Sequence, residues 1–396
     1  MTIKNILLSC MLLLISSFIS FAQDSCIVIG KKHNIYSRIL DEERSIWIYL
    51  PASYNDSVYS QQSYPVLYIF DGDSHFHSVT GIQQYLSKGL YAMIPEMITV
   101  AILNTDRTRD LTPTHDSIEL WKNQKVNFNT SGGGEKFFSF LNEELIPYID
   151  STYHTSGYRI LTGHSFGGLT VINTLLKHTG TFDAYIAIDP SLWWNDRNLL
   201  NHSDSILSSQ DFNGKILYFS MANKALTEHD TTTDHSRAIK EFQKILSRHD
   251  DNGLQWKFRY FDDEDHGSIS LPSEYYGLKY IFDGYQADPK ENAYHPEQII
   301  KLYSALSEKL HFTFLPPESL VDWVGNYCVK LEEFNNALQL FELNIKNYPQ
   351  SYNAYKSSGN YYYKMKNYDS ADEYFKKALE LNPNDKNIQD LLKKIR

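Results

Sequence analysis

Short apolar runs alternate with longer segments in which apolar residues recur every three or four positions between residues 33 and 266. The runs have the length of β-strands, and the longer segments have the period of helices with one buried face. The pattern predicts eight strands, at 33–40, 45–50, 66–70, 98–103, 159–162, 184–188, 216–220 and 255–260. From the third strand onward the residues are almost all apolar, which is typical of strands buried on both faces of a sheet.

The alternation of strands and helices predicts an α/β fold, in which helices cover a mostly parallel, doubly wound sheet of about eight strands. The clearest helical segments are 134–149 and 234–248. After Gly284 the pattern is helical and is interrupted by prolines, which predicts a separate, small all-α helical-repeat domain. The expected organisation is a leader at 1–22, an α/β domain at 23–290, a linker helix at 291–317 and a helical domain at 318–396.

An internal repeat with a period of 34 residues occupies the helical domain. Each copy has the same residues at matching positions: Gly325 and Gly359, Tyr327 and Tyr361, Ala337 and Ala371, Phe341 and Phe375, and Pro349 and Pro383. The pattern resembles the tetratricopeptide repeat, with departures at Asn344 and Cys328, and residues 386–395 are expected to form a closing helix. Because two copies are fewer than a free-standing array needs, we expect them to pack on the preceding domain, through a helix at 296–309.

The charge balance and the apolar stretches limit the classes of partner. Lys and Arg total 37 against 48 Asp and Glu, for a net charge of −11, and no basic stripe favours nucleic acid as a partner. Residues 1–22 combine Lys4, an apolar run and small residues around Phe21, which predicts a signal peptide and an exported, periplasmic or secreted protein. No other apolar stretch has the length that a bilayer requires, so stable membrane insertion is not expected.

Candidate chemistry centres on residues 163–167, which read Gly-His-Ser-Phe-Gly and form a G-x-S-x-G pattern. A predicted strand precedes this segment, and an apolar helix at 168–176 follows it. A serine in such a strand-to-helix turn adopts a strained conformation that raises its hydroxyl above the edge of the sheet. Ser165 is therefore the candidate nucleophile, and the amide of Phe166 is a candidate oxyanion donor.

A serine nucleophile needs a base, and His266 is the best candidate because it lies just past the last predicted strand. A carboxylate must orient this imidazole and balance its charge. In the chain order serine, acid, histidine, the acid is expected after the seventh strand, where Glu228, Asp230 and Asp234 are available. Asp234 also suits the start of the next helix, and the sequence does not separate Glu228 from Asp230. A Ser–His dyad without a carboxylate is a further alternative.

The second oxyanion donor is expected in the loop after the third strand, where Gly72 and Asp73 would turn backbone amides toward the serine. His75 and His77 follow in the same segment and have the H-x-H spacing of metal ligands on a strand. No third ligand falls in this pattern. We therefore expect no metal and no cofactor.

Three residues are candidates for substrate contact. Arg107 follows the fourth strand and would hold an anionic group of the substrate, or it would belong to an Arg–Asp pair that fixes the loop. Trp193 and Trp194 follow the sixth strand and would form the wall of an acyl or aromatic pocket, or serve only in packing.

Four segments in this order resemble the putative-esterase family of α/β-hydrolases, and most closely its siderophore-esterase-like branch. They are 64–73, 104–113, 161–169 and 265–268. This family also includes S-formylglutathione hydrolase and feruloyl esterases. The resemblance implies an α/β-hydrolase fold, Ser165 as nucleophile and His266 as base. It is weakest at the acid, where 223–230 lacks the usual Gly-x-x-Glu of the family.

These features favour an exported serine esterase that cleaves carboxylic esters through an acyl-enzyme, with no cofactor. The expected substrate is a small-molecule ester, either a siderophore trilactone or a feruloyl or acetyl sugar ester. One alternative is an interaction module whose repeats bind a peptide or protein partner while the hydrolase fold serves as a scaffold. Another alternative is an acyltransferase, because the same residues can pass an acyl group to an alcohol instead of water.

Overall fold

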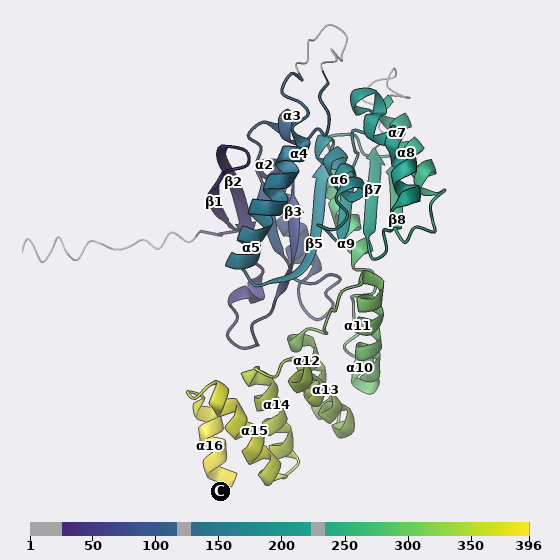
Figure 1. Cartoon of the computed structure of the whole chain (residues 1–396). Helices are drawn as coiled ribbons and strands as arrows, with labels where there is room; N and C mark the ends of the chain where they lie inside the picture. The colour runs from purple at the N-terminus through teal and green to yellow at the C-terminus, as the bar shows by residue number, and fades with distance from the viewer. Residues whose placement is uncertain (1–25, 117–127, 223–233, 396) are drawn as a thin grey trace, which may run out of the picture.

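The computed structural model describes residues 26–116, 128–222 and 234–395 (Figure 1). Its centre is one eight-stranded sheet in the order β1-β2-β4-β3-β5-β6-β7-β8. The β1–β2 and β2–β4 pairs are antiparallel, and all other pairs are parallel. The predicted doubly wound α/β fold is therefore confirmed. The strands are β1 (Lys31–Ser37), β2 (Glu42–Tyr49), β3 (Tyr64–Ile69), β4 (Ile98–Ile102), β5 (Thr155–His164), β6 (Ala184–Ile188), β7 (Ile216–Ala222) and β8 (Gln255–Phe261).

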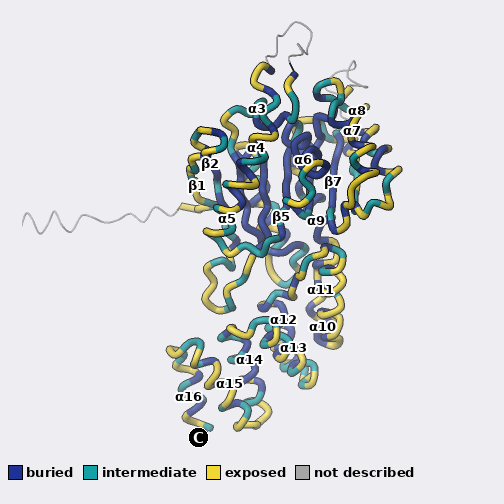
Figure 2. Tube along the Cα trace, in the orientation of Figure 1, coloured by how far each residue is buried: buried dark blue, intermediate teal, exposed yellow. Residues whose placement is uncertain are grey.

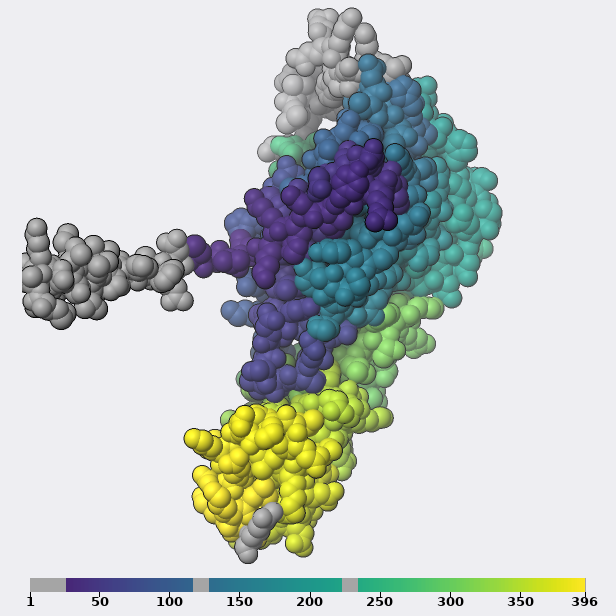
Figure 3. Space-filling model, turned by 60° about the vertical axis from the view of Figure 1, so that its left-hand side comes forward, coloured from purple at the N-terminus to yellow at the C-terminus, as the bar shows by residue number. Residues whose placement is uncertain are grey.

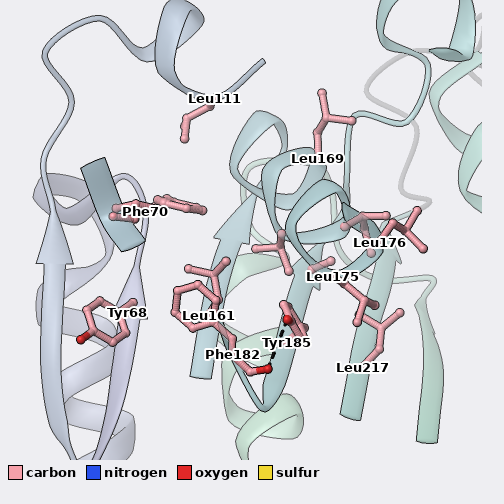
Figure 4. Close-up of a cluster of buried hydrophobic side chains, with 14 of the residues drawn as sticks. Tyr68, Phe70, Leu111, Leu161, Leu169, Leu175, Leu176, Phe182, Tyr185 and Leu217 are labelled. Atoms are coloured by element: carbon pink, nitrogen blue, oxygen red, sulfur yellow. Dashed lines mark hydrogen bonds between the residues drawn. The ribbon is translucent and has the colours of Figure 1, made fainter. Parts of the chain in front are cut away.

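Each face of the sheet has its own apolar core, because successive residues of a strand point to opposite faces. In β3, Tyr68 belongs to one core, whereas Leu67 belongs to the other. Figure 4 shows part of the first core, in which Leu161 of β5 and Leu217 of β7 lie beneath α6. This face is covered by α4 (Gly134–Phe140), α5 (Ile146–Thr152), α6 (Phe166–Lys177), α7 (Trp194–Ser209) and α8 (Asp234–Leu246), and the other by α2 (Gly72–Leu86) and α9 (Ser270–Ile281).

The helix predicted over 134–149 is interrupted in the structure. A π-helical turn, Leu141–Leu145, separates α4 from α5. Pro147 lies in the first turn of α5. Because proline has no amide hydrogen and its ring crowds the preceding turn, it cannot continue a regular α-helix, and the wider turn accommodates it. The sequence pattern thus located the buried face of this segment but not the break.

The carboxyl-terminal part consists of paired helices and a closing helix, as the repeat predicted (Figure 1). An ideal Cβ on Gly325 would lie 2.7 Å from Phe341, and one on Gly359 would lie 2.4 Å from Phe375. The two glycines therefore let both hairpins close tightly. The remaining elements are η1 (Ala52–Asn55), α3 (Arg107–Asp110), α10 (Glu291–Tyr294), α11 (Glu297–Leu310), α12 (Glu318–Lys330), α13 (Phe334–Asn347), α14 (Tyr352–Lys364), α15 (Tyr368–Leu381) and α16 (Lys386–Ile395).

The first repeat shares a core with the hydrolase part. Buried residues of α11, α12 and α13, among them Tyr303, Val324 and Phe341, belong to the same apolar cluster as residues of β3, α2 and α9. Figure 2 shows buried stretches in the repeat part as well as in the sheet. Asn344, where the first copy departs from the repeat pattern, is buried, and its side-chain amide donates to the carbonyl of Glu318 at 3.1 Å. The expected packing of the array on the preceding domain is therefore present. No helix in the described part of the chain combines the length and apolar character that a bilayer crossing needs.

Two glycine substitutions should have opposite effects on stability. We expect Gly325→Ala to lower the free energy of unfolding by about 1 to 2 kcal/mol, since the new methyl group would displace the buried Phe341 ring. We expect Gly81→Ala, in α2, to raise it by about 1 kcal/mol, because alanine favours helix and nothing lies within 4 Å of the new methyl group. Urea unfolding of the two variants and the parent chain measures both changes. Equal effects of the two substitutions would contradict the close helix contact at Gly325.

Candidate active site

Ser165 lies in a strained turn between β5 and α6. Its backbone angles are φ 60° and ψ −114°, a region that L-residues rarely adopt. Gly163 is required here, because a Cβ at this position would lie 2.6 Å from the carbonyl carbon of Gly167. The amide of Ser165 donates to the carbonyl of Ile188 in β6 at 3.0 Å, which fixes the turn against the neighbouring strand. The turn expected from the G-x-S-x-G pattern is therefore formed, and it leaves the serine partly exposed at the carboxyl edge of the sheet.

The structure brings His266 to Ser165, although the two residues are far apart in the chain. His266 Nε2 lies 3.1 Å from Ser165 Oγ. The loop after β8 that carries His266 is held by Asp265, whose Oδ1 accepts the amides of Gly267 at 2.8 Å and Ser268 at 2.9 Å. The acidic cluster beside His266 thus organises its own loop, while the imidazole turns toward the serine.

Asp189 occupies the position of the third member of a triad. Its Oδ2 lies 2.6 Å from His266 Nδ1, and its Oδ1 accepts the amide of Ala222 at 3.1 Å. It directly follows β6, with φ 42°, a left-handed conformation that aspartate tolerates better than most residues. Burial alone would raise the pKa of this carboxyl, but His235 and His266 outweigh burial and hold the pKa well below its usual range. Asp189 is therefore ionised at neutral pH.

The structure differs from the expectation of an acid after the seventh strand, because the described carboxylate that contacts His266 is Asp189. Asp234 begins α8 and forms an ion pair with Arg197 rather than contacting the imidazole. Glu228 and Asp230 lie outside the described residues. The carboxylate that contacts His266 comes from the end of β6, and sequence reasoning missed it. Its signal was present, because an aspartate at the carboxyl end of an apolar strand in a parallel sheet points to the edge where catalytic groups gather.

Two further histidines surround the His266–Asp189 pair. The ring centroid of His164 lies 4.5 Å from that of His266, and burial, aided by the nearby His266, lowers the pKa of His164 to about 3. His164 is therefore neutral at physiological pH. His235 Nε2 lies 3.1 Å from Asp189 Oδ2, so Asp189 faces two imidazoles.

One ring nitrogen each of His164 and His266 and one carboxylate oxygen of Asp189 all lie within 4.8 Å of one another, which is compatible with a three-ligand metal site. The same atoms of His266 and Asp189 already contact each other and Ser165. Metal binding there would therefore have to break the contacts that run from Ser165 through His266 to Asp189. His75 and His77 lie in helix α2 and not on a strand, so their side chains diverge and do not form the H-x-H pair of a metal site.

The amino-terminal turns of α2 and α6 meet beside Ser165. Gly72 and Asp73 form the first turn of α2 rather than a loop. An ideal Cβ on Gly167 would lie 3.4 Å from Phe70 Cβ and 3.5 Å from Asp71 Oδ2, so the start of α6 lies against the turn that leads into α2. Amides at the starts of helices have no intrahelical partners, which suits them to stabilise an anion. Phe166, Gly72 and Asp73, which were expected to supply the oxyanion donors, thus lie at two adjacent helix starts.

Arg107 contacts the turn before α2. Its guanidinium donates to Asp71 through Nε at 2.6 Å and Nη2 at 2.9 Å, and Nη2 also reaches the carbonyl of His164 at 3.3 Å. Asn104 donates to the same carboxylate at 2.7 Å. The Arg–Asp pairing considered for this loop is therefore formed, although with Asp71. Arg107 joins three segments at the site, and its charge is already balanced by a carboxylate.

Loss of Arg107 should destabilise the protein. We expect Arg107→Gln to lower the free energy of unfolding by about 2 kcal/mol, because it leaves the buried Asp71 carboxylate without its arginine partner. This loss is smaller than for a fully buried ion pair, because about a third of the arginine side chain is exposed. Arg248→Gln is the matched control, since its pair with Asp204 is exposed and should contribute less than about 1 kcal/mol. Thermal and urea unfolding measure both changes. Equal losses in the two variants would contradict a structural role for the Arg107–Asp71 pair.

Aromatic side chains gather next to Ser165. Phe166 contacts Trp193 and Trp194 with ring centroids 6.0 and 5.0 Å apart, and Phe128 lies 5.0 Å from Trp194. Trp194 is buried, and its indole N–H donates to the carbonyl of Thr114 at 3.0 Å. Trp193 is only partly buried. Trp194 is thus a packing residue, whereas Trp193 leaves an aromatic surface accessible near the serine.

A second hydroxyl lies beside the nucleophile candidate. Ser191 Oγ is 3.2 Å from Ser165 Oγ, and the amide of Ser191 donates to the carbonyl of Ser165 at 3.0 Å. Ser191 was not among the predicted site residues. It is buried and does not contact His266, so its position favours orientation of the Ser165 hydroxyl rather than attack on a substrate.

Family models match both parts of the chain. A model described as "Putative esterase" matches residues 37–254, which include Ser165 and Asp189. A tetratricopeptide repeat model matches residues 352–385, which cover the α14–α15 pair. The resemblances suggested by the sequence are therefore confirmed.

The most informative relatives include one characterised protein and two solved structures. The chain is 30% identical over 218 residues to ferri-bacillibactin esterase BesA of Bacillus subtilis, covering 52% of this chain and 74% of BesA. An IroE-like serine hydrolase from Shewanella oneidensis has a TM-score of 0.71 and 30% identity, covering 80% of this chain and 98% of that structure. An uncharacterised protein from Capnocytophaga ochracea covers 92% of this chain and 99% of its own, with a TM-score of 0.60 and 15% identity, which indicates a shared fold alone.

Proposed function

Because this chain belongs to the putative esterase family and is a carboxylic ester hydrolase, we propose that it acts as a serine esterase on siderophore esters. The observation that carries the proposal is the contact chain from Ser165 Oγ through His266 to Asp189, with distances of 3.1 and 2.6 Å.

The reaction follows from the positions of these groups. Ser165 Oγ attacks the ester carbonyl carbon while His266 Nε2 takes the hydroxyl proton, and the resulting imidazolium is balanced by Asp189. The amide of Phe166 and an amide at the start of α2 stabilise the oxyanion. His266 then gives its proton to the leaving alkoxide, which departs as an alcohol and leaves an acyl-enzyme. Water, activated by His266, cleaves the acyl-enzyme and releases the carboxylic acid.

The aromatic surface beside the serine favours an aromatic acyl group. Trp193 is partly exposed and lies beside the buried Phe166, with ring centroids 6.0 Å apart, so an aromatic group of the ester can add a further ring at Trp193. BesA, which shares 30% identity with this chain, is named for a ferri-bacillibactin substrate. A catecholate trilactone combines an aromatic group with an ester, so it is the substrate class that we propose.

Export and partner binding are secondary parts of the proposal. The predicted signal peptide, 1–22, lies outside the described residues, and we propose periplasmic or secreted localisation on its sequence alone. The amino-terminal residue of the mature protein tests this, because cleavage after Ala22 would leave Gln23 first. The tetratricopeptide match supports binding of a peptide or protein partner by the repeat part.

An ester panel on the purified protein tests the proposed activity. A catecholate trilactone, methyl ferulate, an acetylated sugar and p-nitrophenyl acetate should be compared by kcat/KM, together with labelling by a fluorophosphonate probe. The trilactone is expected to give the highest kcat/KM, and the label is expected on Ser165. A folded protein that is neither labelled nor active on any ester would contradict the proposal. Product analysis with a competing alcohol distinguishes hydrolysis from acyl transfer.

A further inference from the structure

A large cavity lies at the other end of the sheet, between the hydrolase part and the repeats. Its volume is ≈ 1090 Å³, and it is lined by hydrolase loops around 52–65 and 84–96 and by residues of α11, α12 and α13. Tyr64 at the start of β3 lines this cavity, whereas Asp71 beyond the end of β3 lies at the candidate active site. The length of the strand therefore separates the two sites by roughly 20 Å.

The two parts of the protein are connected beside this cavity. The backbone amide and hydroxyl of Ser60 donate to the carboxylate of Glu318 at 2.9 and 2.8 Å, and Ser351 donates to the same carboxylate. Figure 3 shows the purple-blue hydrolase loop that meets the yellow-green repeat region. The walls thus come from both parts, and a ligand in the cavity would contact both.

Aromatic rings form much of the lining. The hydrolase part contributes Tyr59, Tyr64 and Tyr285, and the repeat part contributes Trp323 and Tyr348. The indole of Trp323 is partly exposed and stacks on Tyr327 with ring centroids 5.0 Å apart, so one face of the indole remains available. The faces of such rings attract cations through their quadrupoles.

Carboxylates dominate the charge of the lining. Asp56, Glu96 and Asp322 line the cavity, and Lys88 is the only cationic residue among the lining residues. In the described structure these three carboxylates accept from hydroxyl and amide groups, and none has a lysine, arginine or histidine at ion-pair distance. Burial raises the pKa of Asp322, and burial together with nearby carboxylates, Asp322 first among them, raises the pKa of Tyr59 to about 12. Glu96 and Asp322 are partly buried, and buried carboxylates are usually paired with a cation, which neither of them has at ion-pair distance among the described residues.

We propose that the cavity between the hydrolase part and the repeats binds a small organic cation, an alkylammonium or guanidinium compound. The cationic group lies against the carboxylate of Asp322 and the partly exposed ring of Trp323, with Glu96 as a second carboxylate of the lining, while the ligand's carbon chain fills the apolar part of the cavity. The volume suits a ligand of this size. Because the ligand contacts both parts, its binding stabilises their association and raises the melting temperature, by an amount that grows with the logarithm of the ligand concentration above Kd.

Calorimetric titration of the full chain with matched ligands tests the charge requirement. Hexamethylenediamine and argininamide are expected to bind at one site and to raise Tm, whereas hexanediol and adipate, which have the same chain length as the diamine, are expected not to bind. Equal binding of the diamine and the diol would overturn the proposal, and so would the absence of diamine binding at millimolar concentration. A lysine-containing peptide that binds more tightly than the diamine would overturn the small-molecule assignment.

Substitutions locate the site. The double variant Glu96→Gln and Asp322→Asn is expected to weaken diamine binding at least tenfold, with folding checked by circular dichroism. Asp369→Asn, at an exposed position in α15 away from the lining, is the matched control and should bind as the parent chain does. Unchanged diamine affinity in the folded double variant would overturn the proposal. Quenching of Trp323 fluorescence in the parent chain, absent in Trp323→Phe, is a second measurement that does not depend on the carboxylate variants.

Discussion

Ser165→Ala is expected to lower kcat by about 10⁶-fold on any ester that the protein cleaves, with little change in stability. The alanine removes the only hydroxyl that contacts His266 Nε2, at 3.1 Å, in the described structure. It keeps the Cβ and therefore the packing of the turn. The residual rate should reflect oxyanion stabilisation and substrate binding alone. Steady-state kinetics on p-nitrophenyl acetate and on the best substrate of the ester panel, together with loss of fluorophosphonate labelling, measure the effect.

Ser191→Ala is the matched control for this experiment. Ser191 Oγ lies 3.2 Å from Ser165 Oγ, so a neighbouring hydroxyl is removed without loss of the nucleophile candidate. The loss of one hydrogen bond should lower kcat by no more than about tenfold. If Ser191→Ala abolished activity and labelling while Ser165→Ala retained them, the nucleophile would have to be reassigned to Ser191.

The fold was predictable because its pattern is local. Most of the predicted strands from the third onward are apolar runs separated by amphipathic segments, and a parallel sheet buried on both faces produces such runs. The repeat was equally predictable from the sequence, because Gly325 and Gly359 recur at a fixed spacing. In the structure each of them faces a phenylalanine of its own hairpin. The break at Pro147 was not predicted, because apolar periodicity does not distinguish a π turn from an α turn.

The candidate site was only partly predictable, because its members meet through the order of the strands and not through spacing in the chain. Ser165 and His266 follow from the turn motif and from the position after the last strand. Asp189 stands at the carboxyl end of an apolar strand, which marks it as a candidate, but preferring it over the acids after β7 requires the strand order, in which β6 lies between β5 and β7. Its carboxylate thereby reaches the imidazole from the strand next to the nucleophile. The pairing of Arg107 with Asp71 was also missed, because its partner lies across two loops that only the folded chain brings together.

Asp189→Asn is expected to lower kcat by about 10⁴-fold. The carboxylate accepts from His266 Nδ1 and so keeps the imidazole in the tautomer whose Nε2 can take the proton of Ser165. The asparagine amide can instead donate to Nδ1, which places the imidazole proton on Nε2 and removes the base. The near-identical shape of asparagine should preserve the fold, so the loss should appear in kcat rather than in Tm. Kinetics and thermal unfolding of the same preparation separate the two effects.

The alternative carboxylates supply the decisive comparison for this prediction. Glu228→Gln and Asp230→Asn alter the residues that the chain order of serine, acid and histidine favours, and both should leave kcat close to that of the parent chain. Asp234→Asn should also retain activity, because Asp234 pairs with Arg197 and does not contact the imidazole. A large loss of kcat in Glu228→Gln or Asp230→Asn, with Asp189→Asn still active, would show that the carboxylate of the triad comes from the segment after β7. Retained activity in all four variants would instead favour a Ser165–His266 dyad, in which the serine and the histidine act without a carboxylate.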